Sequence, residues 1–189
     1  MQQLKNFREK WSLTGIALVG FSGTLSPVFD YADGNTKVTM TGGGATIEAY
    51  KVNGQLYTRA PVLGVVPADQ SNPLAPTAEN LFALPDQILK VIIPSGAQYT
   101  RAGSETVNGR AATKYTSTIA VSDLGVLNPA LSGQQGSAAT TVWVDDAQGY
   151  IAAVDATISA TTSGTTATPI KVHLDVTDVG QVPAITVPK

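Results

Sequence analysis

The sequence predicts a mainly β protein with about ten antiparallel strands and two apolar helical insertions. Apolar and polar residues alternate with a period of two over most of the chain, as in strands that face a core on one side. Dipeptides that favour tight hairpin turns separate several of these segments. Threonine, whose β-branched side chain favours strands over helices, occurs 23 times.

Length and composition limit the possible classes of protein. The 189 residues suit a single domain, 1–189, with a sizeable core, and an apolar share of 43% excludes a disordered chain. The net charge of −2 and the charged share of 14% leave no basic stripe, so we expect no nucleic-acid partner. The chain contains no cysteine, which excludes disulfides, thiol catalysis and thiolate metal sites. No stretch approaches the roughly 18 apolar residues that a membrane-spanning helix requires.

The first segment combines the end of a helix with a long strand. We expect residues 1–7 to form the last turns of a helix and residues 11–21 to form the strand, because apolar or small side chains recur at every second position. These positions are Trp11, Leu13, Gly15, Ala17, Val19 and Phe21. A signal peptide is a weaker interpretation, since the apolar run is short and Glu9 lies among its basic residues.

Hairpins account for most of the remaining chain. Strands are expected over 25–32, 36–41, 45–52, 55–60, 97–103, 110–122, 138–145, 150–160 and 166–178. Asp33-Gly34, Asn53-Gly54 and Asn108-Gly109 supply the positive-φ residues that two-residue hairpin turns require. The last strand alternates most clearly, with apolar residues from Ile170 to Val176 facing inward and polar ones from Lys171 to Asp175 facing outward.

Two insertions, over about residues 61–94 and 123–137, interrupt this pattern. The first contains six prolines among apolar residues, and we expect it to form two short helices, the second beginning at Pro85. Both insertions are more apolar than surface loops usually are. We therefore expect them to cover the apolar face of the sheet.

The apolar insertions permit two interpretations. They are ordinary core, or they leave a cleft for an apolar ligand between themselves and a strongly curved sheet. Alternation and helical spacing predict the lining of that cleft as Trp11, Leu13, Phe21, Leu63, Val66, Leu81, Leu84, Ile88, Ile92, Tyr115 and Trp143. The position of Trp143 has an alternative, in which Val142 and Val144 face the cleft instead.

The sequence offers no candidate catalytic residue. The single histidine, His173, is expected on the polar face of a strand, solvated and titrating near its ordinary pKa of about 6.5. Asp145-Asp146 leads into a turn that Asp commonly caps. The glycines at 42–44 precede a strand and not a helix, which favours a hairpin loop over a phosphate site. We therefore expect no catalytic residue, no metal site and no cofactor, and so no enzyme.

The last third of the chain holds its most characteristic run of features. The segment VWVD (Val142–Asp145), a short turn, a strand, a second turn and the segment DVGQVPAITVP follow one another in that order. Two earlier segments are also characteristic of this chain: NGQLYTRA and VNGRAATKYTSTIAVSDL. In this order of features the whole chain resembles the LppX/LprAFG family of bacterial cell-envelope lipoproteins, whose fold is similar to that of the lipoprotein carrier LolA.

The resemblance implies a half-open antiparallel β-barrel of about eleven strands, with helices on its concave face and a hydrophobic cavity for acyl chains. It implies that the protein binds or carries a lipid, a lipoglycan or an acylated molecule outside the cytoplasm, in the bacterial cell envelope. The family contacts the membrane surface through a lipidated cysteine that follows a signal peptide. This chain has neither feature, and we expect them to belong to a segment that is not included. The alternative is a sensor or interaction domain on the same scaffold, with other envelope proteins as partners.

Overall fold

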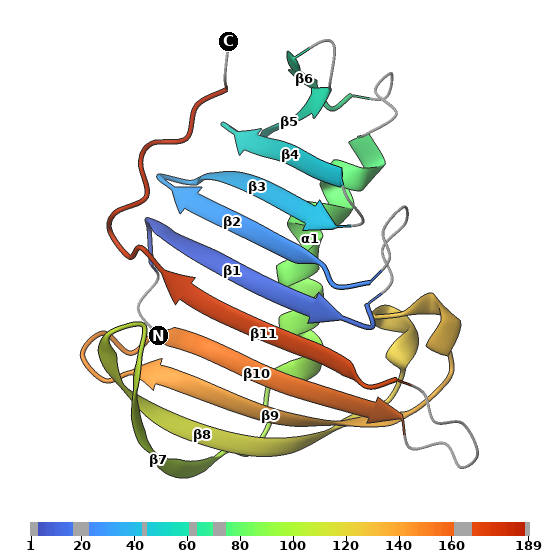
Figure 1. Cartoon of the computed structure of the whole chain (residues 1–189), viewed down its shortest axis with the longest axis vertical. Helices are drawn as coiled ribbons and strands as arrows, with labels where there is room; N and C mark the ends of the chain where they lie inside the picture. Colours follow the sequence, from blue (N-terminus) through green and yellow to red (C-terminus); the bar gives the residue numbers. More distant parts are fainter. Residues whose placement is uncertain are drawn as a thin grey trace.

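The computed structural model of the chain describes residues 4–16, 23–42, 45–60, 64–69, 75–160 and 168–187. Within these ranges, eleven strands form one antiparallel sheet and one α-helix crosses a face of it (Figure 1). The strands are β1 (Phe7–Thr14), β2 (Ser26–Ala32), β3 (Asn35–Gly42), β4 (Ala45–Val52), β5 (Gln55–Ala60), β6 (Gly64–Pro67), β7 (Thr100–Val107), β8 (Arg110–Val121), β9 (Gly136–Asp145), β10 (Ile151–Ala160) and β11 (Ile170–Thr177). The helix is α1 (Ala75–Ile92), and two 3₁₀ helices are η1 (Leu124–Val126) and η2 (Pro129–Leu131).

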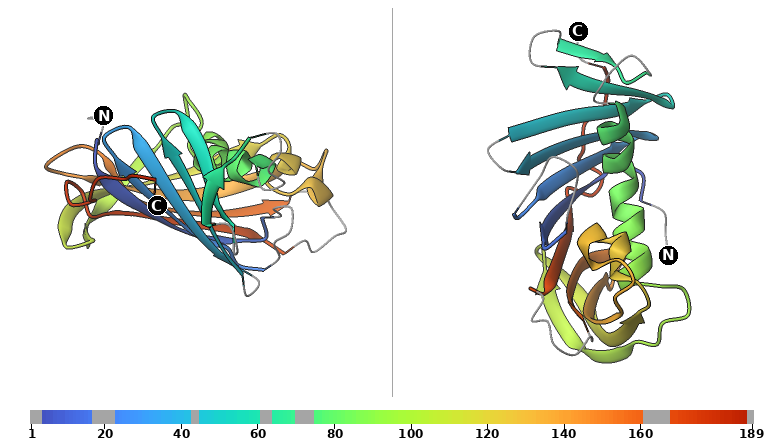
Figure 2. Two further views of the ribbon diagram at one scale, coloured as in Figure 1. Left: turned by 90° about the horizontal axis from the view of Figure 1, so that it is seen from above. Right: turned by 90° about the vertical axis from the view of Figure 1, so that its right-hand side faces the viewer.

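The sheet is open and curved. Its strand order is β6-β5-β4-β3-β2-β1-β11-β10-β9-β8-β7, so β6 and β7 are its two edges. Figure 2 shows the sheet bending around α1, which lies on the concave side. This arrangement fits the half-open β-barrel that the family resemblance implies, although the helical part is smaller than expected.

Pairing of the first and last strands joins the two halves of the sheet. In β1 the residues from Arg8 to Thr14 pair antiparallel with those from Thr177 back to Lys171 in β11. All the other pairs join strands that are neighbours in the sequence. The chain therefore forms two meanders that meet at the centre of the sheet.

The three predicted hairpin turns are confirmed. Asp33, Asn53 and Asn108 each have a φ of 51°, and the glycine after each also has a positive φ. Two consecutive positive-φ residues form the turn whose twist matches that of paired strands. These dipeptides therefore set the register of β2–β3, β4–β5 and β7–β8 locally.

The prediction for the start of the chain is partly wrong. Residues 4–6 are not helical, and β1 already begins at Phe7. The strand ends at Thr14, because Gly15 has a φ of +78° and approaches β11 closely: a Cβ there would lie 3.3 Å from the Cα of Ile170. The rest of the predicted strand, at 17–22, lies outside the described residues.

Within its described residues, 64–69 and 75–94, the first insertion forms one helix and not two. Pro85 lies inside α1, although a proline in a helix interior costs about 3 kcal/mol. The apolar stripe of the helix continues through it, and tertiary packing of such a stripe supplies most helical stability in proteins. The stripe consists of Ala78, Leu81, Leu84, Ile88 and Ile92, all buried against the sheet. The sequence also missed the short strand β6 within this insertion.

One core fills the space between α1 and the concave face. The inward residues predicted in β11, from Ile170 to Val176, all belong to it, which confirms the alternation there. Its largest fully buried side chains in the strands include Phe29 and Met40. Within the described ranges, no helix combines the length and apolar character needed to cross a membrane.

The outer face has a smaller apolar cluster, which the sequence analysis did not predict. The segment after β11 crosses the ends of β1 to β5, as Figure 1 shows in red, and buries Val182 and Ile185. These side chains pack against Ala32, Tyr50 and Val52, and the carbonyl of Ile185 accepts a hydrogen bond from Asn35 Nδ2 at 3.2 Å. The C-terminal segment thus covers apolar residues that would otherwise face water.

A charge at Ile88 should unfold the protein. Ile88 is 0% exposed, so Ile88→Asp buries an unpaired carboxylate, at an expected cost of about 4 kcal/mol or more. The neighbouring Gln87 is exposed, and Gln87→Asp should change stability by less than about 0.5 kcal/mol. Urea denaturation of the two variants measures the difference. Similar stability of both variants would contradict the packed interface of α1.

Candidate functional site

The concave face brings most of the predicted lining residues together. Trp11, Leu13, Leu81, Leu84, Ile88 and Ile92 all lie in the core between β1 and α1, each at most 4% exposed. They contact a common apolar interior, as expected from their spacing. The interface that they form is filled with side chains, so they act here as core residues.

The other predicted lining residues lie apart from this group. Tyr115 of β8 lines a small pocket described below, and Val66 is half-buried in the edge strand β6, opposite Thr58 of β5. Phe21 and Leu63 lie outside the described residues. Their role as ligand contacts stays a prediction.

The prediction that Trp143 lines the cleft is wrong. Val142 is buried and Val144 packs against the core, so Trp143 between them lies on the outer face. There its Nε1 donates a hydrogen bond to Glu105 Oε2 at 3.1 Å, and the Nζ of Lys114 lies 5.4 Å from the ring centroid. The alternative that places the two valines inward is the correct one.

An apolar pocket lies beside the C-terminal end of α1. It has a volume of about 180 Å³ and is lined by Ile93, Tyr99, Tyr115, Val142, Val144 and Ile151. The hydroxyl of Tyr99 donates to the carbonyl of Ile92 at 3.2 Å, so its polar atom is already satisfied. The volume is below the ~300 Å³ at which typical ligand sites begin, and it suits only part of an alkyl chain.

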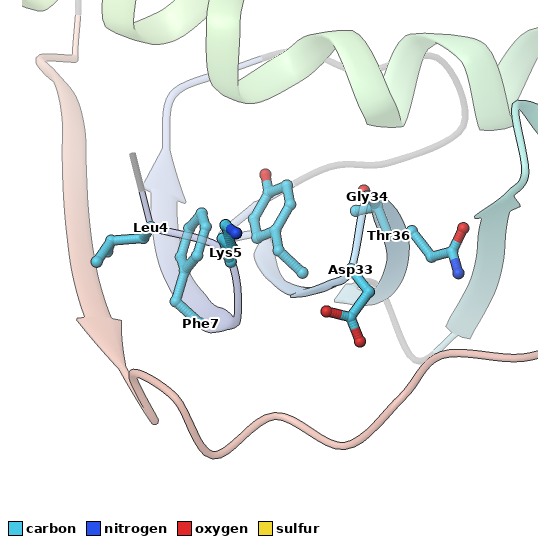
Figure 3. Close-up of a pocket in the computed structure, with 8 residues that line it drawn as sticks. Leu4, Lys5, Phe7, Asp33, Gly34 and Thr36 are labelled. Carbon is cyan, nitrogen blue, oxygen red and sulfur yellow. The ribbon is translucent and has the colours of Figure 1, made fainter. Parts of the chain in front are cut away.

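A second pocket, of about 470 Å³, lies at the hairpin end of the same face (Figure 3). Its lining comes from the start of the chain and from the β2–β3 hairpin: Leu4, Lys5, Phe7, Tyr31, Asp33, Gly34, Asn35 and Thr36. The rings of Phe7 and Tyr31 stack, with centroids 4.4 Å apart and planes at 15°. The sequence does not indicate this pocket, because its pattern places residues 4–7 in a helix, whereas Phe7 lies in β1 and pairs with Tyr31 of β2.

Glu9 places a carboxylate on this apolar face. Its Oε2 accepts hydrogen bonds from Trp11 Nε1 at 3.1 Å and from Tyr31 Oη at 3.2 Å. Burial raises the pKa of Glu9 above its ordinary value; the two hydrogen bonds oppose this shift, and the nearby charge of Asp86 adds to it. Burial and the charge of Glu9 also raise the pKa of Tyr31. Glu9 lies two residues before Trp11 in the same strand, so the sequence spacing alone indicates that both side chains face inward.

Apolar contacts hold α1 on the sheet. The side chains of its stripe, from Ala78 to Ile92, are all apolar and belong to the core. The charge of Asp86, an exposed residue of α1, adds to the raised pKa of Glu9, so these two carboxylates repel. Along this stripe the contacts of the helix are apolar, and apolar contacts are not directional.

His173 lies on the outer face, as predicted, but its expected pKa is wrong. Its Nδ1 lies 2.7 Å from Asp155 Oδ1 and its Nε2 lies 2.9 Å from Asp175 Oδ2. Partial burial lowers the pKa of His173, but the two carboxylates outweigh it and the net shift is upward. Both ring nitrogens donate only in the imidazolium form, so the contact favours the charged histidine.

The other polar motifs have structural roles. Asp145 Oδ1 accepts from the backbone N–H of Ala147 at 3.0 Å and of Gln148 at 2.7 Å, which confirms the predicted turn. An ion pair with Arg110 lowers the pKa of Asp145. Gly42 pairs with Ala45 in the β3–β4 hairpin, and residues 43–44 lie outside the described ranges. In the described part of the chain, no group of three acidic or histidine side chains is placed to hold a metal.

Comparisons with known proteins agree with this geometry. The family model described as LppX_LprAFG lipoprotein matches residues 14–183. The crystal structure of lipoprotein LppX from Mycobacterium tuberculosis superposes with a TM-score of 0.56 at 14% identity, covering 98% of this chain and 90% of that chain. The crystal structure of LprF from Mycobacterium bovis superposes with a TM-score of 0.52 at 15% identity, covering 97% of this chain and 89% of that chain. At such identities the two structures support the fold. A search of curated proteins finds no match.

His173→Ala should destabilise the protein in a pH-dependent way. Because the pKa of His173 is raised by folding, its contribution is present below about pH 6.5 and fades as the pH rises through the raised pKa. The side chain is 45% exposed and therefore screened by water, so we expect a loss of about 0.5–1 kcal/mol at acidic pH. Lys171→Ala, on the same face, should show no such trend in urea titrations at several pH values. A loss that is independent of pH would contradict this assignment.

Glu9→Gln should stabilise the protein at neutral pH. A raised carboxyl pKa means that the folded state binds the proton more tightly, so the charge of Glu9 destabilises the fold as the pH rises above about 4.3. Thermal melting should therefore show a higher Tm for Glu9→Gln near pH 7 and little difference near pH 4. Glu105→Gln is the control, because Lys114 and Trp143 lower the pKa of Glu105 and its loss should not stabilise. A lower Tm for Glu9→Gln at neutral pH would refute the expectation.

Proposed function

The chain belongs to the LppX/LprAFG lipoprotein family, and from this premise we propose that it binds a lipid or acylated molecule between its concave face and α1. In this proposal the protein is a carrier or binder and not an enzyme. It acts outside the cytoplasm, in the bacterial cell envelope. The proposal extends to lipids, lipoglycans and other acylated molecules, since all of them present alkyl chains.

One observation carries the proposal: an amphipathic helix covers the concave face of an open sheet, and its buried stripe from Ala78 to Ile92 contacts the core through apolar side chains. Apolar contacts are not directional, and an alkyl chain can replace those of a side chain. Inserting a chain between Leu84 or Ile88 and the sheet would break no hydrogen bond. Each buried CH₂ group contributes about 0.8 kcal/mol, which offsets the cost of moving the helix.

In this proposal, the pocket beside Tyr115 is the place where the alkyl chain of the ligand enters. It opens at the C-terminal end of α1, where the helix is followed by the turn at Gly96, and its lining is continuous with the core through Val142. In this proposal the pocket is the part of the site that exists without ligand. Longer chains then require α1 to move away from the sheet.

The alternative, a sensor or interaction domain, would use an exposed apolar patch on the outer face. Among the described outer-face residues, the apolar cluster around Tyr50 and Val52 is covered by Val182 and Ile185. No specific observation favours this alternative over ligand binding. A stoichiometric protein partner captured without any lipid would favour it.

Displacement of a fluorescent fatty acid tests the proposal. The protein should bind the probe saturably, and mass spectrometry after extraction with organic solvent should identify acylated ligands. Val142→Phe fills the pocket and should weaken binding about tenfold, a loss of about 1.4 kcal/mol. Thr141→Phe points to the other face and should leave binding unchanged. The absence of saturable binding in the unmodified protein would refute the proposed function.

A further inference from the structure

Glu9 carries a charge that the fold does not neutralise. The carboxylate is largely buried on an apolar face, and its partners Trp11 and Tyr31 are neutral donors. Both donate to Oε2, and no described residue donates to Oε1. A buried carboxylate is normally paired with a cation, because its desolvation is costly. Here the paired cation is missing among the described residues.

Asp86 increases the negative potential around Glu9. Asp86 of α1 is near enough to raise the pKa of both Glu9 and Tyr31. Asp33 and Lys5 line the adjacent pocket, and both are exposed. Lys5 makes no ion pair with a described carboxylate, so Glu9 has no cation within ion-pair distance among the described residues.

Two aromatic side chains contact the carboxylate, and a third stacks on one of them. Trp11 and Tyr31 hold it by hydrogen bonds, and Phe7 stacks on Tyr31 at the wall of the 470 Å³ pocket (Figure 3). Aromatic faces attract cations through their quadrupole, and this attraction strengthens where water is excluded. A carboxylate with a free oxygen beside such faces is complementary to an ammonium group.

We propose that Glu9, together with Tyr31 and Phe7, binds the ammonium head group of an amphiphile whose alkyl chain lies along the concave face. This inference rests on the proposed function, since the alkyl chain occupies the site between sheet and helix. The head group enters from the pocket at the β2–β3 hairpin and donates to Glu9 Oε1. A neutral hydroxyl would satisfy the oxygen but leave the charge, and an anionic group would be repelled by Glu9 and Asp86.

Three probes with the same alkyl chain separate the head-group preference from chain binding. Dodecylamine, dodecanol and dodecanoate are titrated below their aggregation concentrations into the full chain by isothermal calorimetry at about pH 7.5. We expect dodecylamine to bind about tenfold more tightly than dodecanol, with dodecanoate the weakest, because charge-assisted hydrogen bonds are about twice as strong as neutral ones. The preference for the amine should decrease as the pH falls through the raised pKa of Glu9 and the carboxylate gains a proton, while dodecanol binding stays constant.

Matched variants assign the preference to Glu9. Glu9→Gln keeps an acceptor for Trp11 and Tyr31 and should bring amine and alcohol to within about twofold. Glu105→Gln is the control, since Glu105 also accepts from a tryptophan Nε1 at 3.1 Å but lies on the outer face. It should retain the full preference. Asp86→Asn leaves the two hydrogen bonds of Glu9 intact and should reduce the preference two- to threefold, so it serves if Glu9→Gln does not fold.

The outcomes separate this inference from the proposed function. Equal binding of amine and alcohol, or a preference that survives in both Glu9→Gln and Asp86→Asn, overturns the head-group site and leaves alkyl-chain binding standing. Failure of all three probes to bind overturns both. Tighter binding of dodecanoate than of dodecylamine would assign the opposite charge to the ligand and also overturn the inference.

Discussion

The packing of α1 on the concave face is the contact on which the rest of the structure depends. An eleven-stranded open sheet with one apolar face cannot leave that face in water, and the inner residues of β1 and β11 are too apolar to be surface. One helix of 18 residues covers them with its apolar stripe from Ala78 to Ile92. Because that cover uses apolar contacts, the face that stabilises the fold is also the face that an alkyl chain can occupy.

The same pair of residue types behaves in opposite ways on the two faces. Trp11 donates to Glu9 and Trp143 donates to Glu105, each at 3.1 Å from Nε1. Burial raises the pKa of Glu9, whereas the hydrogen bonds from Lys114 and Trp143 lower that of Glu105, which lies in solvent. The difference comes from the surroundings and not from the hydrogen bond, which is alike in both. The hydrogen bond from Trp11 therefore does not explain why the charged Glu9 lies on the apolar face of the sheet.

Features that depend on residues close together in the sequence could be predicted, whereas features that depend on contacts between distant residues could not. The turns at Asp33 and Asn53 depend on two residues each, and the alternation of β11 on eight, so both were readable. The helix around Pro85 was divided wrongly, because the local cost of proline is visible in sequence while the packing that outweighs it is not. The stack of Phe7 on Tyr31 depends on which strands pair. No local pattern contains that information.

The pairing of β1 with β11 has a consequence for how the chain folds. Arg8 lies opposite Thr177, so the central pair of the sheet closes only when almost the entire chain is available. Contacts between residues so distant in sequence slow folding, because the loop entropy is lost before the contact forms. During synthesis, β1 to β5 would present an unpaired edge at β1 until β11 emerges, and unpaired edges promote association between chains. The N-terminal half of the sheet is therefore exposed to association with other chains for as long as the last strand is still being made.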